Sequence, residues 1–522
     1  MKKTGKQLIK AFAALSLMTA FVACEAEDGM DGAQGEQGEQ GPKGDKGDKG
    51  DDGEDFVPSE FPPLTESRTP NFLKLEPAFS SVKITPILSS EDKIEGTPDF
   101  IYGSMADGAG LLPADENGNY TLINNIEADY SIARIKLNED LKPISGEYIL
   151  NAEATASTAQ CSGSLITPEE HGFGPLYLSG GEWGGASKGV FVTDPMKNAD
   201  DASMAEMLAS MGQWSTENAV AIGKDAFSEN TIVFIGDDHS DNETPSGQLG
   251  MYVGEKGDLN GGKLYGLKVT STDINFEVDM EEGIEYEAEF VELEEKEIDL
   301  LDAEAKEKGV MGFSRLEDID WRRGSAENNR EIYFAVTGRE KPGLIGKGTI
   351  LGRIYKVVLD ENMLTSDNDG FMKAKITCVL DGDKVGGKAE GFHSPDNILV
   401  TENYAYIQED PNGYLDFETN GYAKLYQYNL SSGELKTVLE CAQVQAAANG
   451  YGSVERSWEI TGMIDVTDIT KSNENTFLVI TQNHGWEPVD VNGTFTDPKA
   501  NPDLVNARKE GSVLSVITGL ER

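Results

Sequence analysis

The sequence has few histidines, few cysteines and few basic residues for its length. There are 4 histidines and 4 cysteines among 522 residues, which disfavours a zinc site and a disulfide scaffold. Lys and Arg total 44 against 92 Asp and Glu, so the formal net charge is -48. A molecule of this charge repels nucleic acid and anionic lipid. The composition therefore excludes a nucleic-acid-binding role.

Several motifs of well-known enzyme classes are also missing. The sequence has no Gly-rich phosphate loop followed by Lys and Ser or Thr, and no His-Glu-x-x-His. These motifs place phosphate-binding amides and zinc-ligating histidines respectively. If the chain is an enzyme, its chemistry must therefore come from other side chains.

Beyond the N-terminus there is no apolar run of the roughly 18 residues that a transmembrane helix needs. At the N-terminus, four lysines precede an apolar stretch at residues 11–22, which predicts a signal peptide over residues 1–23. The residues Phe21-Val22-Ala23-Cys24 resemble a bacterial lipobox, which implies lipidation of Cys24. The alternative is an ordinary secretory peptide with a chance cysteine. An acidic run at residues 25–28 resembles the surface-export signal of bacterial lipoproteins, so we expect a surface-exposed outer-membrane lipoprotein.

A strict three-residue repeat follows, with glycine at every third position from Gly29 to Gly53. Such a period is typical of a collagen triple helix, in which only glycine fits at the axis. Pro42 is the single proline of the repeat, so preorganisation is weak. The sequence therefore predicts either a stalk that forms a homotrimer or a flexible hydrophilic tether over residues 24–55. A linker over residues 56–70 leads to the body of the protein.

Residues 71–522 are rich in short β-type runs separated by Gly, Asn and Asp, which predicts an all-β fold. An apolar strand that ends in polar residues recurs, and three examples start at residues 332, 404 and 476, which are 72 apart. Gly/Tyr-rich return strands follow, as at residues 352–359 and 423–430. This pattern favours a β-propeller, with a large β-sandwich as the alternative. Helical patterns at residues 203–211 and 294–308 are expected to be insertions.

Polar residues stand at the ends of these predicted strands. Corresponding strand ends of a propeller meet at one mouth of its channel, so they are expected to form a ring. Carboxylate and amide oxygens suit Ca²⁺, which takes about 6 to 8 oxygen ligands. For each residue alone, a solvated turn is the alternative. The members are Glu182, Asp237, Asp238, Glu317, Asp396, Glu409, Asp410, Gln482 and His484.

Six segments resemble motifs of the PhoX-type alkaline phosphatases and occur in the order found in that family. The family consists of secreted six-bladed propellers whose active site combines iron and calcium. The resemblance therefore implies a metal-dependent phosphatase that hydrolyses phosphate monoesters. The segments are Gln160–Pro168, Leu178–Trp183, Phe234–Asp238, Phe313–Glu317, Ser394–Ile398 and Val479–Gly485.

The resemblance also implies roles for individual residues. Cys161 would be a thiolate ligand of Fe³⁺, and Glu317 a carboxylate ligand at the catalytic centre. Arg315 would hold the substrate phosphate with its planar fork of donors. The same resemblance implies that Glu182, Asp238, Asp396 and Glu409 or Asp410 are metal ligands. Of these, Asp396 and Glu409 or Asp410 would bind Ca²⁺. Asn397 and His484 would be substrate-binding residues.

The sequence departs from the family pattern at two of these segments. Gly181 and Glu182 stand where the family has adjacent glutamates, so one ligand position is empty or is filled by Glu169 or Glu170. The segment ending at Glu317 lacks the proline of the family. A second hypothesis is therefore a non-catalytic, calcium-stabilised propeller that binds a partner or a glycan. Only the phosphatase hypothesis requires Cys161, Arg315 and Glu317 to meet at one site. The alternative for Cys161 is an inert buried thiol, the commoner state of a free cysteine.

Overall fold

The computed structural model describes residues 66–239, 241–365, 372–411, 421–470, 472–490, 493–502 and 510–522. The chain divides into two units, Met1–Ser59 and Glu60–Arg522, and the description below concerns the second. The predicted signal peptide, Cys24, the collagen-like repeat and residues 56–65 of the linker lie outside the described residues. No helix among the described residues is both long and apolar enough to cross a membrane.

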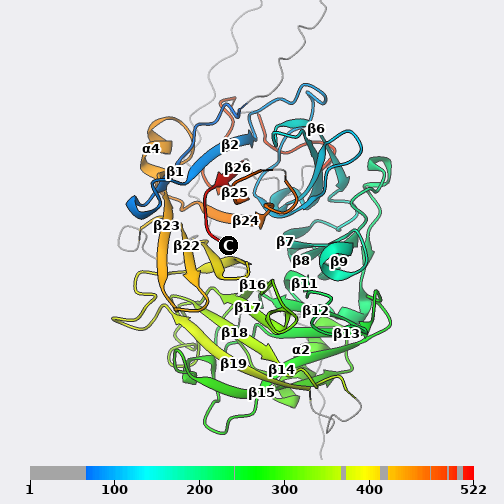
Figure 1. Cartoon of the computed structure of the whole chain (residues 1–522), viewed down its shortest axis with the longest axis vertical. Helices are drawn as coiled ribbons and strands as arrows, with labels where there is room; N and C mark the ends of the chain where they lie inside the picture. The colour runs from blue at the N-terminus through cyan, green and yellow to red at the C-terminus, as the bar shows by residue number, and fades with distance from the viewer. Residues whose placement is uncertain are drawn as a thin grey trace, which may run out of the picture. The chain divides into compact units, whose positions relative to one another are not determined.

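The described chain is built almost entirely of antiparallel β-sheets (Figure 1). One four-stranded sheet has the order β3 (Ala106–Leu112), β4 (Tyr120–Ile126), β5 (Ser131–Leu137), β6 (Pro143–Leu150). The next has the order β7 (Thr158–Ile166), β8 (Leu176–Gly184), β9 (Gly189–Thr193), β10 (Glu206–Met207).

A nine-stranded sheet follows. Its order is β11 (Thr216–Ala221), β12 (Asn230–Asp237), β13 (Leu249–Glu255), β14 (Lys263–Val269), β15 (Glu285–Leu293), β19 (Met372–Asp381), β18 (Arg353–Leu359), β17 (Glu331–Val336), β16 (Leu316–Trp321). The pairing of β15 with β19 joins its two halves.

The last two sheets each include a strand from the start of the described chain. One has the order β20 (Pro395–Val400), β21 (Tyr404–Glu409), β22 (Lys424–Asn429), β23 (Leu435–Cys441), β1 (Leu73–Leu75). The other has the order β24 (Glu459–Asp465), β25 (Thr476–Asn483), β26 (Gly511–Thr518), β2 (Lys83–Ser89). Because β2 completes the sheet that contains the C-terminal strand β26, the two ends of the body are held together by backbone hydrogen bonds.

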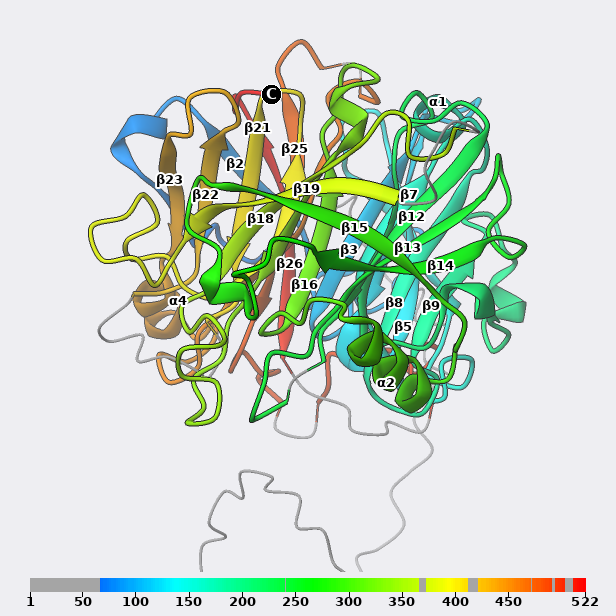
Figure 2. The same cartoon turned by 90° about the horizontal axis from the view of Figure 1, so that it is seen from below.

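The sheets are arranged as in a β-propeller (Figures 1 and 2). Six strands contact one another in a ring, in the order β3, β7, β11, β16, β20, β24, and β24 contacts β3 again. We call them the inner strands, and each is followed in the chain by the second strand of its sheet or half-sheet. These six inner strands therefore enclose a central channel. The competing prediction of a sandwich would instead require two sheets packed face to face.

The strands that sequence periodicity identified are the second strands of the sheets. The three evenly spaced runs coincide with β17, β21 and β25, and every described position of β25 is buried. Each second strand lies between neighbouring sheets and is covered on both faces, so its sequence is a continuous apolar run rather than an alternating one. The predicted all-β fold is confirmed.

Helices are short and few in the described part of the chain. The α-helices are α1 (Pro168–His171), α2 (Ile298–Lys308) and α4 (Gln443–Ala448). The 3-10 helices are η1 (Pro77–Phe79), η2 (Glu127–Asp129), η3 (Ala199–Asp201), η4 (Ala209–Met211), η5 (Glu277–Asp279) and η6 (Asn328–Arg330).

One of the two predicted helical insertions is confirmed and the other is wrong. The pattern at residues 294–308 forms α2, which packs on the core through Leu301 and Ala305. Residues 203–211 instead form β10, paired with β9, followed by the single turn η4. The backbone N–H of Leu208 donates to the carbonyl of Val190, so pairing with the neighbouring strand replaces helical hydrogen bonding there.

Candidate metal centre

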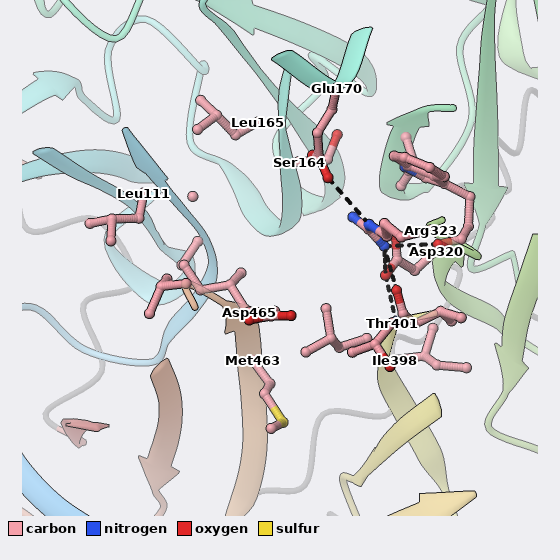
Figure 3. Close-up of a pocket in the computed structure, with 18 of the residues that line it drawn as sticks. Leu111, Ser164, Leu165, Glu170, Asp320, Arg323, Ile398, Thr401, Met463 and Asp465 are labelled. Atoms are coloured by element: carbon pink, nitrogen blue, oxygen red, sulfur yellow. Dashed lines mark hydrogen bonds and ion pairs between the residues drawn. The ribbon is translucent and has the colours of Figure 1, made fainter. Parts of the chain in front are cut away.

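The central channel has two ends, set by the direction of the inner strands. The later residues of all six inner strands line a cavity of about 700 Å³ at one end, which we call the far pocket (Figure 3). The starts of the same strands lie at the other end. In antiparallel sheets, the end of each second strand lies beside the start of the first strand. The C-terminal residues of β8, β12, β21 and β25 therefore also lie at the end of the channel where the inner strands start.

Five inner strands carry an acidic residue at their first or second position. These are Asp107 on β3, Glu217 on β11, Glu317 on β16, Asp396 on β20 and Glu459 on β24. On β7 the corresponding region carries Cys161.

A repeated irregularity aims these side chains, except that of Glu459, which precedes the irregular segment of β24. Each inner strand shifts its register against the second strand by one residue, within the segments 106–109, 160–163, 216–219, 316–319, 395–398 and 461–464. A β-bulge of this kind leaves a residue unpaired and changes the direction of its side chain. Strand alternation is interrupted there, and neighbouring polar residues can both face the channel.

The inner strands approach one another closely at glycines beside the bulges. A Cβ on Gly108 would lie 2.2 Å from the backbone nitrogen of Gly163, and one on Gly462 would lie 2.5 Å from the carbonyl oxygen of Asp107. Gly462 also has a φ of +55°, which favours glycine. The close packing of β3 against β7 and β24 therefore depends on glycine.

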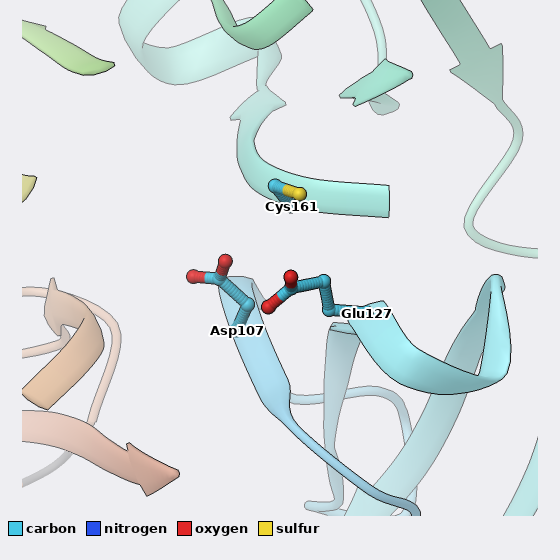
Figure 4. A group of neighbouring side chains, drawn as sticks. All are labelled: Asp107, Glu127 and Cys161. Atoms are coloured by element: carbon cyan, nitrogen blue, oxygen red, sulfur yellow. The ribbon is translucent and has the colours of Figure 1, made fainter. Parts of the chain in front are cut away.

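The converging side chains form four groups whose potential ligand atoms lie within 4.8 Å of one another. Figure 4 shows the first group, in which Asp107, Glu127 and Cys161 point toward the same space. Cys161 and Glu217 each belong to two groups, so three of the groups are continuous. We call the full set the channel cluster. Its groups are Asp107, Glu127 and Cys161; Cys161, Glu182 and Glu217; Glu217, Glu317 and Asp396; and Asp410, Glu459 and His484.

The channel cluster concentrates negative charge in a buried space. Its members include eight carboxylates, and burial followed by the charge of Glu182 raises the pKa of Glu217 well above its usual range. Burial and then Glu127 do the same to the pKa of Asp107, and burial and then Asp410 to that of Glu459. So many buried carboxylates require either protons or bound cations.

The thiol of Cys161 lies inside this set. It is 2% exposed and its Sγ donates a hydrogen bond of 3.0 Å to Oε2 of Glu182. Burial and the charge of Glu182 raise the pKa of the thiol well above its usual range. Without a cation the sulfur is therefore a neutral thiol, whereas a bound metal ion would favour the thiolate.

Arg315 lies at the rim of the channel cluster. Its Nε and Nη2 donate to the two carboxylate oxygens of Asp238 at 3.0 and 2.9 Å, and Nη2 is 2.9 Å from Oε1 of Glu317. The residue precedes β16 and has a φ of +66°, a left-handed conformation that is costly for a side chain with a Cβ. Such strain is kept where the position of the side chain matters. The guanidinium brings one positive charge to the eight carboxylates.

Three predicted residues bring further polar atoms to the cluster, and one of them, His484, is a member of it. His484 donates from Nδ1 to Oε2 of Glu510 over 2.9 Å, and among the described residues its buried Nε2 has no hydrogen-bond partner. Gln482 donates to Glu127 over 2.9 Å, while its buried Oε1 has no partner in the described part of the chain. Asn397 donates to Ser162 Oγ over 2.6 Å. Unpaired buried oxygens of this kind are suited to a cation or a ligand.

The structure brings together most of the predicted ring but not all of it. Cys161, Arg315 and Glu317 meet at one mouth through Glu182 and Glu217. Glu409 lies outside the four groups, because its carboxylate accepts from the backbone N–H of His393 and of Lys424, each at 2.9 Å. Its neighbour Asp410 is a member. Asp237 is also outside, bonded to the backbone N–H of Ser215 at 3.0 Å.

The position left open by Gly181 is not filled by Glu169 or Glu170. A Cβ at Gly181 would lie 2.7 Å from the ring of Phe191 and 2.8 Å from a carbonyl oxygen, so the site has no room for a glutamate. Glu169 and Glu170 line the far pocket, away from the channel cluster. Glu127, on η2, comes within reach of Cys161 instead.

Asp107, Glu127, Glu217 and Glu459 were not among the residues predicted from sequence. A signal was present in four of the inner strands, where an acidic residue is followed by glycine, asparagine or aspartate. It can be seen in Asp107-Gly108, Glu217-Asn218, Glu317-Asp318 and Asp396-Asn397. These strands lack a long apolar run, so periodicity did not align them.

No protein-family model matches the sequence, and no curated protein matches it. Among solved structures, the chain is similar to Pseudomonas fluorescens PhoX in complex with vanadate, a transition state analogue. The TM-score is 0.57 at 14% identity, covering 86% of this chain and 96% of that one. The α-L-arabinofuranosidase Arb93A from Fusarium graminearum has a TM-score of 0.33 at 10% identity, covering 78% and 92%. The first similarity shows that the two chains share a fold.

Proposed function

We propose that this protein is a metal-dependent phosphatase that hydrolyses phosphate monoesters at the channel cluster. One observation carries the proposal: eight carboxylates, a thiol and an arginine converge at one mouth of a propeller that shares its fold with PhoX. On this proposal, the nine-stranded sheet counts as two blades joined through β15 and β19, which gives six blades in all.

The donor set fits the metals that the sequence resemblance implies. Carboxylate oxygens are the preferred ligands of Ca²⁺, and the groups around Glu217, Glu317 and Asp396 and around Asp410 and Glu459 supply them. A thiolate favours a softer metal, so Cys161 with Glu182 and Glu217 would hold iron. Bound cations would neutralise the charge of the phosphate and activate an oxygen nucleophile.

The charge of the cluster makes cations a requirement for this activity. A phosphate monoester is an anion, and eight carboxylates around one arginine would repel it. The same carboxylates become an attractive site once cations occupy the cluster. We therefore expect the channel cluster of the metal-free protein to bind phosphate no more tightly than the rest of the protein surface does.

The side chains of the protein position the substrate. Asp238 holds one edge of the Arg315 guanidinium, at Nε and Nη2, so the guanidinium is fixed at the rim with 18% of its side chain exposed. From there it would bind phosphoryl oxygens through its remaining donors. His484, oriented by Glu510, would direct Nε2 to an oxygen of the substrate.

The location of the enzyme follows from the N-terminal segments. We propose that the body is attached to the outer membrane through a lipid on Cys24 and faces the outside of the cell. Residues 24–55 would separate it from the membrane as a collagen-like trimer or as a flexible tether. An enzyme in that position would release phosphate from external esters.

The proposal is tested with the purified mature chain and p-nitrophenyl phosphate, after removal of metals and after addition of Ca²⁺ and Fe³⁺. We expect turnover that depends on the added metals. Arg315→Ala should lower kcat/KM by about 100-fold or more, since it removes a charge-stabilising donor. Arg134→Ala is the matched control, because Arg134 also pairs with a carboxylate, Glu147, but on the sheet of β5 and β6.

Absence of turnover, or turnover that Arg315→Ala does not change, would contradict the phosphatase. The second hypothesis, a non-catalytic calcium-stabilised propeller, would then stand if Ca²⁺ still raised thermal stability. The closed position at Gly181 favours it, since a ligand of the PhoX-type motif has no room there.

A further inference from the structure

Glu277 is a fully buried carboxylate that has no role in the proposed mechanism. It lies on η5, in the connection between β14 and β15. Its Oε1 accepts hydrogen bonds from the backbone N–H of Ser314 at 2.9 Å and of Thr349 at 3.0 Å. Packing around this oxygen is tight, since a Cβ on Gly348 would overlap Oγ of Ser314 and lie 3.3 Å from Oε1. Ser314 immediately precedes Arg315, so Glu277 reaches the residue next to the arginine at the rim of the channel cluster.

The same oxygen closes a ring of backbone hydrogen bonds around Ser314. Thr349 is held by Glu277 through its N–H, and its carbonyl accepts from the N–H of Arg339 at 3.0 Å. The N–H of the preceding residue, Gly338, donates to the carbonyl of Ser314 at 3.0 Å. Both backbone groups of Ser314 are therefore fixed, the N–H by Glu277 and the carbonyl by Gly338.

Arg315 needs such support because of its backbone conformation. Its φ of +66° lies in the left-handed region, where a residue with a Cβ is disfavoured. Its carbonyl accepts from the N–H of Thr337 at 3.0 Å, so the restraints continue on its C-terminal side. From this conformation its guanidinium donates to both carboxylate oxygens of Asp238. If the N–H of Ser314 lost its acceptor, the strain would favour a return to negative φ, and the guanidinium would move away from Asp238.

The helix η5 is itself held in place from β18. Nη1 of Arg353 donates to the backbone carbonyl of Glu277 at 2.8 Å and to that of Met280 at 3.1 Å. The hydroxyl of Tyr355 donates to the carbonyl of Glu277 at 3.2 Å, and Nη2 of Arg353 is paired with Asp381 at 2.7 Å. These contacts fix the backbone that carries Glu277 and leave its Oε1 to the two N–H groups.

From these contacts we infer that Glu277 is a positioning residue for Arg315. Its carboxylate holds the N–H of Ser314 and thereby the backbone conformation that directs the guanidinium toward Asp238 and the phosphate. The inference rests on the proposed function, because it takes Arg315 as the side chain that binds the substrate phosphate. Glu277 is not a member of the channel cluster and acts through the arginine alone.

The test compares Glu277→Leu with Glu277→Gln in the purified mature chain supplied with Ca²⁺ and Fe³⁺. Leucine removes the acceptor, whereas glutamine keeps a carbonyl oxygen for the two N–H groups. We expect Glu277→Leu to lower kcat/KM for p-nitrophenyl phosphate by about 10- to 100-fold, as misplacement of a positioned group does, and Glu277→Gln to retain the original value. If Glu277→Leu does not fold, as judged by circular dichroism, Glu277→Met removes the acceptor with a more flexible side chain.

Asp92→Leu is the control for loss of a buried carboxylate that holds backbone N–H groups. Asp92 is 1% exposed and accepts from the N–H of Arg68 at 2.9 Å and of Ser89 at 2.8 Å, in the sheet that contains β2. Its substitution should lower thermal stability and leave kcat/KM unchanged.

A double-mutant cycle separates positioning from general packing. Because Glu277 acts through Arg315, Glu277→Leu should not lower kcat/KM further in the Arg315→Ala background. A residue that supports only packing would lower kcat/KM by the same factor in both backgrounds. That result would overturn the inference, as would a Glu277→Leu variant as active as the original chain or a Glu277→Gln variant as impaired as Glu277→Leu.

The crystal structure of Glu277→Leu gives a readout that does not depend on turnover. We expect Arg315 to adopt a negative φ and to lose its contact with both oxygens of Asp238. An unchanged Arg315 overturns the inference whether or not the protein is a phosphatase. Absence of turnover in the original chain counts against the proposed function alone, and the structure of the variant then decides whether Glu277 positions Arg315.

Discussion

At the scale of single residues, burial gives Glu277 an unusual state. It is fully buried, and its carboxylate accepts hydrogen bonds from the backbone N–H of Ser314 at 2.9 Å and of Thr349 at 3.0 Å. Burial outweighs these bonds and the nearby Arg353, and raises the pKa of Glu277 to about 7. Glu277 therefore keeps its proton in the folded protein at pH values where the unfolded chain has lost it.

A pH-dependent stability follows for Glu277. Because folding raises the pKa of Glu277, its contribution to the free energy of unfolding is full below about pH 4.5 and is lost as the pH rises to about 7. The loss is on the order of 3 kcal/mol. Glu277→Gln keeps an acceptor and cannot ionise, so the fall in unfolding free energy between pH 5 and pH 8 should be smaller than in the original chain. Denaturant unfolding at both pH values measures this, and parallel curves for the two proteins would refute it.

Cys161 differs from the other buried cysteines by its neighbours. Cys378 and Cys441 are also free and buried, but neither belongs to the channel cluster. Cys161→Ala should therefore remove iron and reduce phosphatase turnover, while Cys378→Ala should cost about 1 kcal/mol of stability and leave the iron content unchanged. Elemental analysis of the two purified variants makes the comparison. Equal iron content in both would assign Cys161 the role of an inert buried thiol.

At the scale of elements, Asp318 ties three inner strands together. It lies on β16, accepts a hydrogen bond from Asn218 of β11, and accepts from the backbone N–H of Ile398 on β20 at 3.0 Å. Glu217 and Glu317 immediately precede Asn218 and Asp318, and Asp396 lies two residues before Ile398. These three carboxylates form one group of the cluster. Asp318 thus positions the carboxylates without belonging to their group.

Asp318→Ala should lower the affinity for Ca²⁺ by roughly 10- to 100-fold, as the loss of an orienting partner does in metal sites. Asp320→Ala is a matched control on the same strand, since Asp320 accepts from the backbone N–H of Val400 on β20 at 2.6 Å but is not next in sequence to any member of the channel cluster. Calorimetric titration with Ca²⁺ provides the readout. If both variants lose affinity equally, Asp318 supports only the general packing of the strands.

The sequence allowed the fold to be predicted because the second strands are long, buried and apolar. The inner strands were harder to identify, since β11 and β20 carry polar residues at bulges that break the alternation expected of a strand. Glu217 was missed for this reason, whereas Glu317 and Asp396 were found both as polar residues of the predicted ring and through the family resemblance. Glu409 shows the remaining difficulty: one residue decides whether a side chain faces the channel or the interior of a sheet.

At the scale of the whole molecule, closure of the ring depends on the start of the described chain. β2 pairs with β26, and Leu88 of β2 is 1% exposed in the core that contains Leu514. A chain beginning at residue 91 would lose β1 and β2 and expose the edge of β26. Unpaired edges promote aggregation.

We therefore expect the chain from residue 91 to aggregate or to unfold at a much lower temperature than the chain from residue 60. Thermal unfolding followed by circular dichroism, with light scattering, compares the two. Equal midpoints and no scattering would show that closure by β2 contributes little.

The central claim is that the acidic end of the channel is a metal centre, and the metal content of the mature chain tests it most directly. Elemental analysis after purification without chelators should find calcium and iron, and the calcium should fall in Glu217→Gln and the iron in Cys161→Ala. A folded, monodisperse protein that contains neither metal, and binds neither when they are added, would contradict the account.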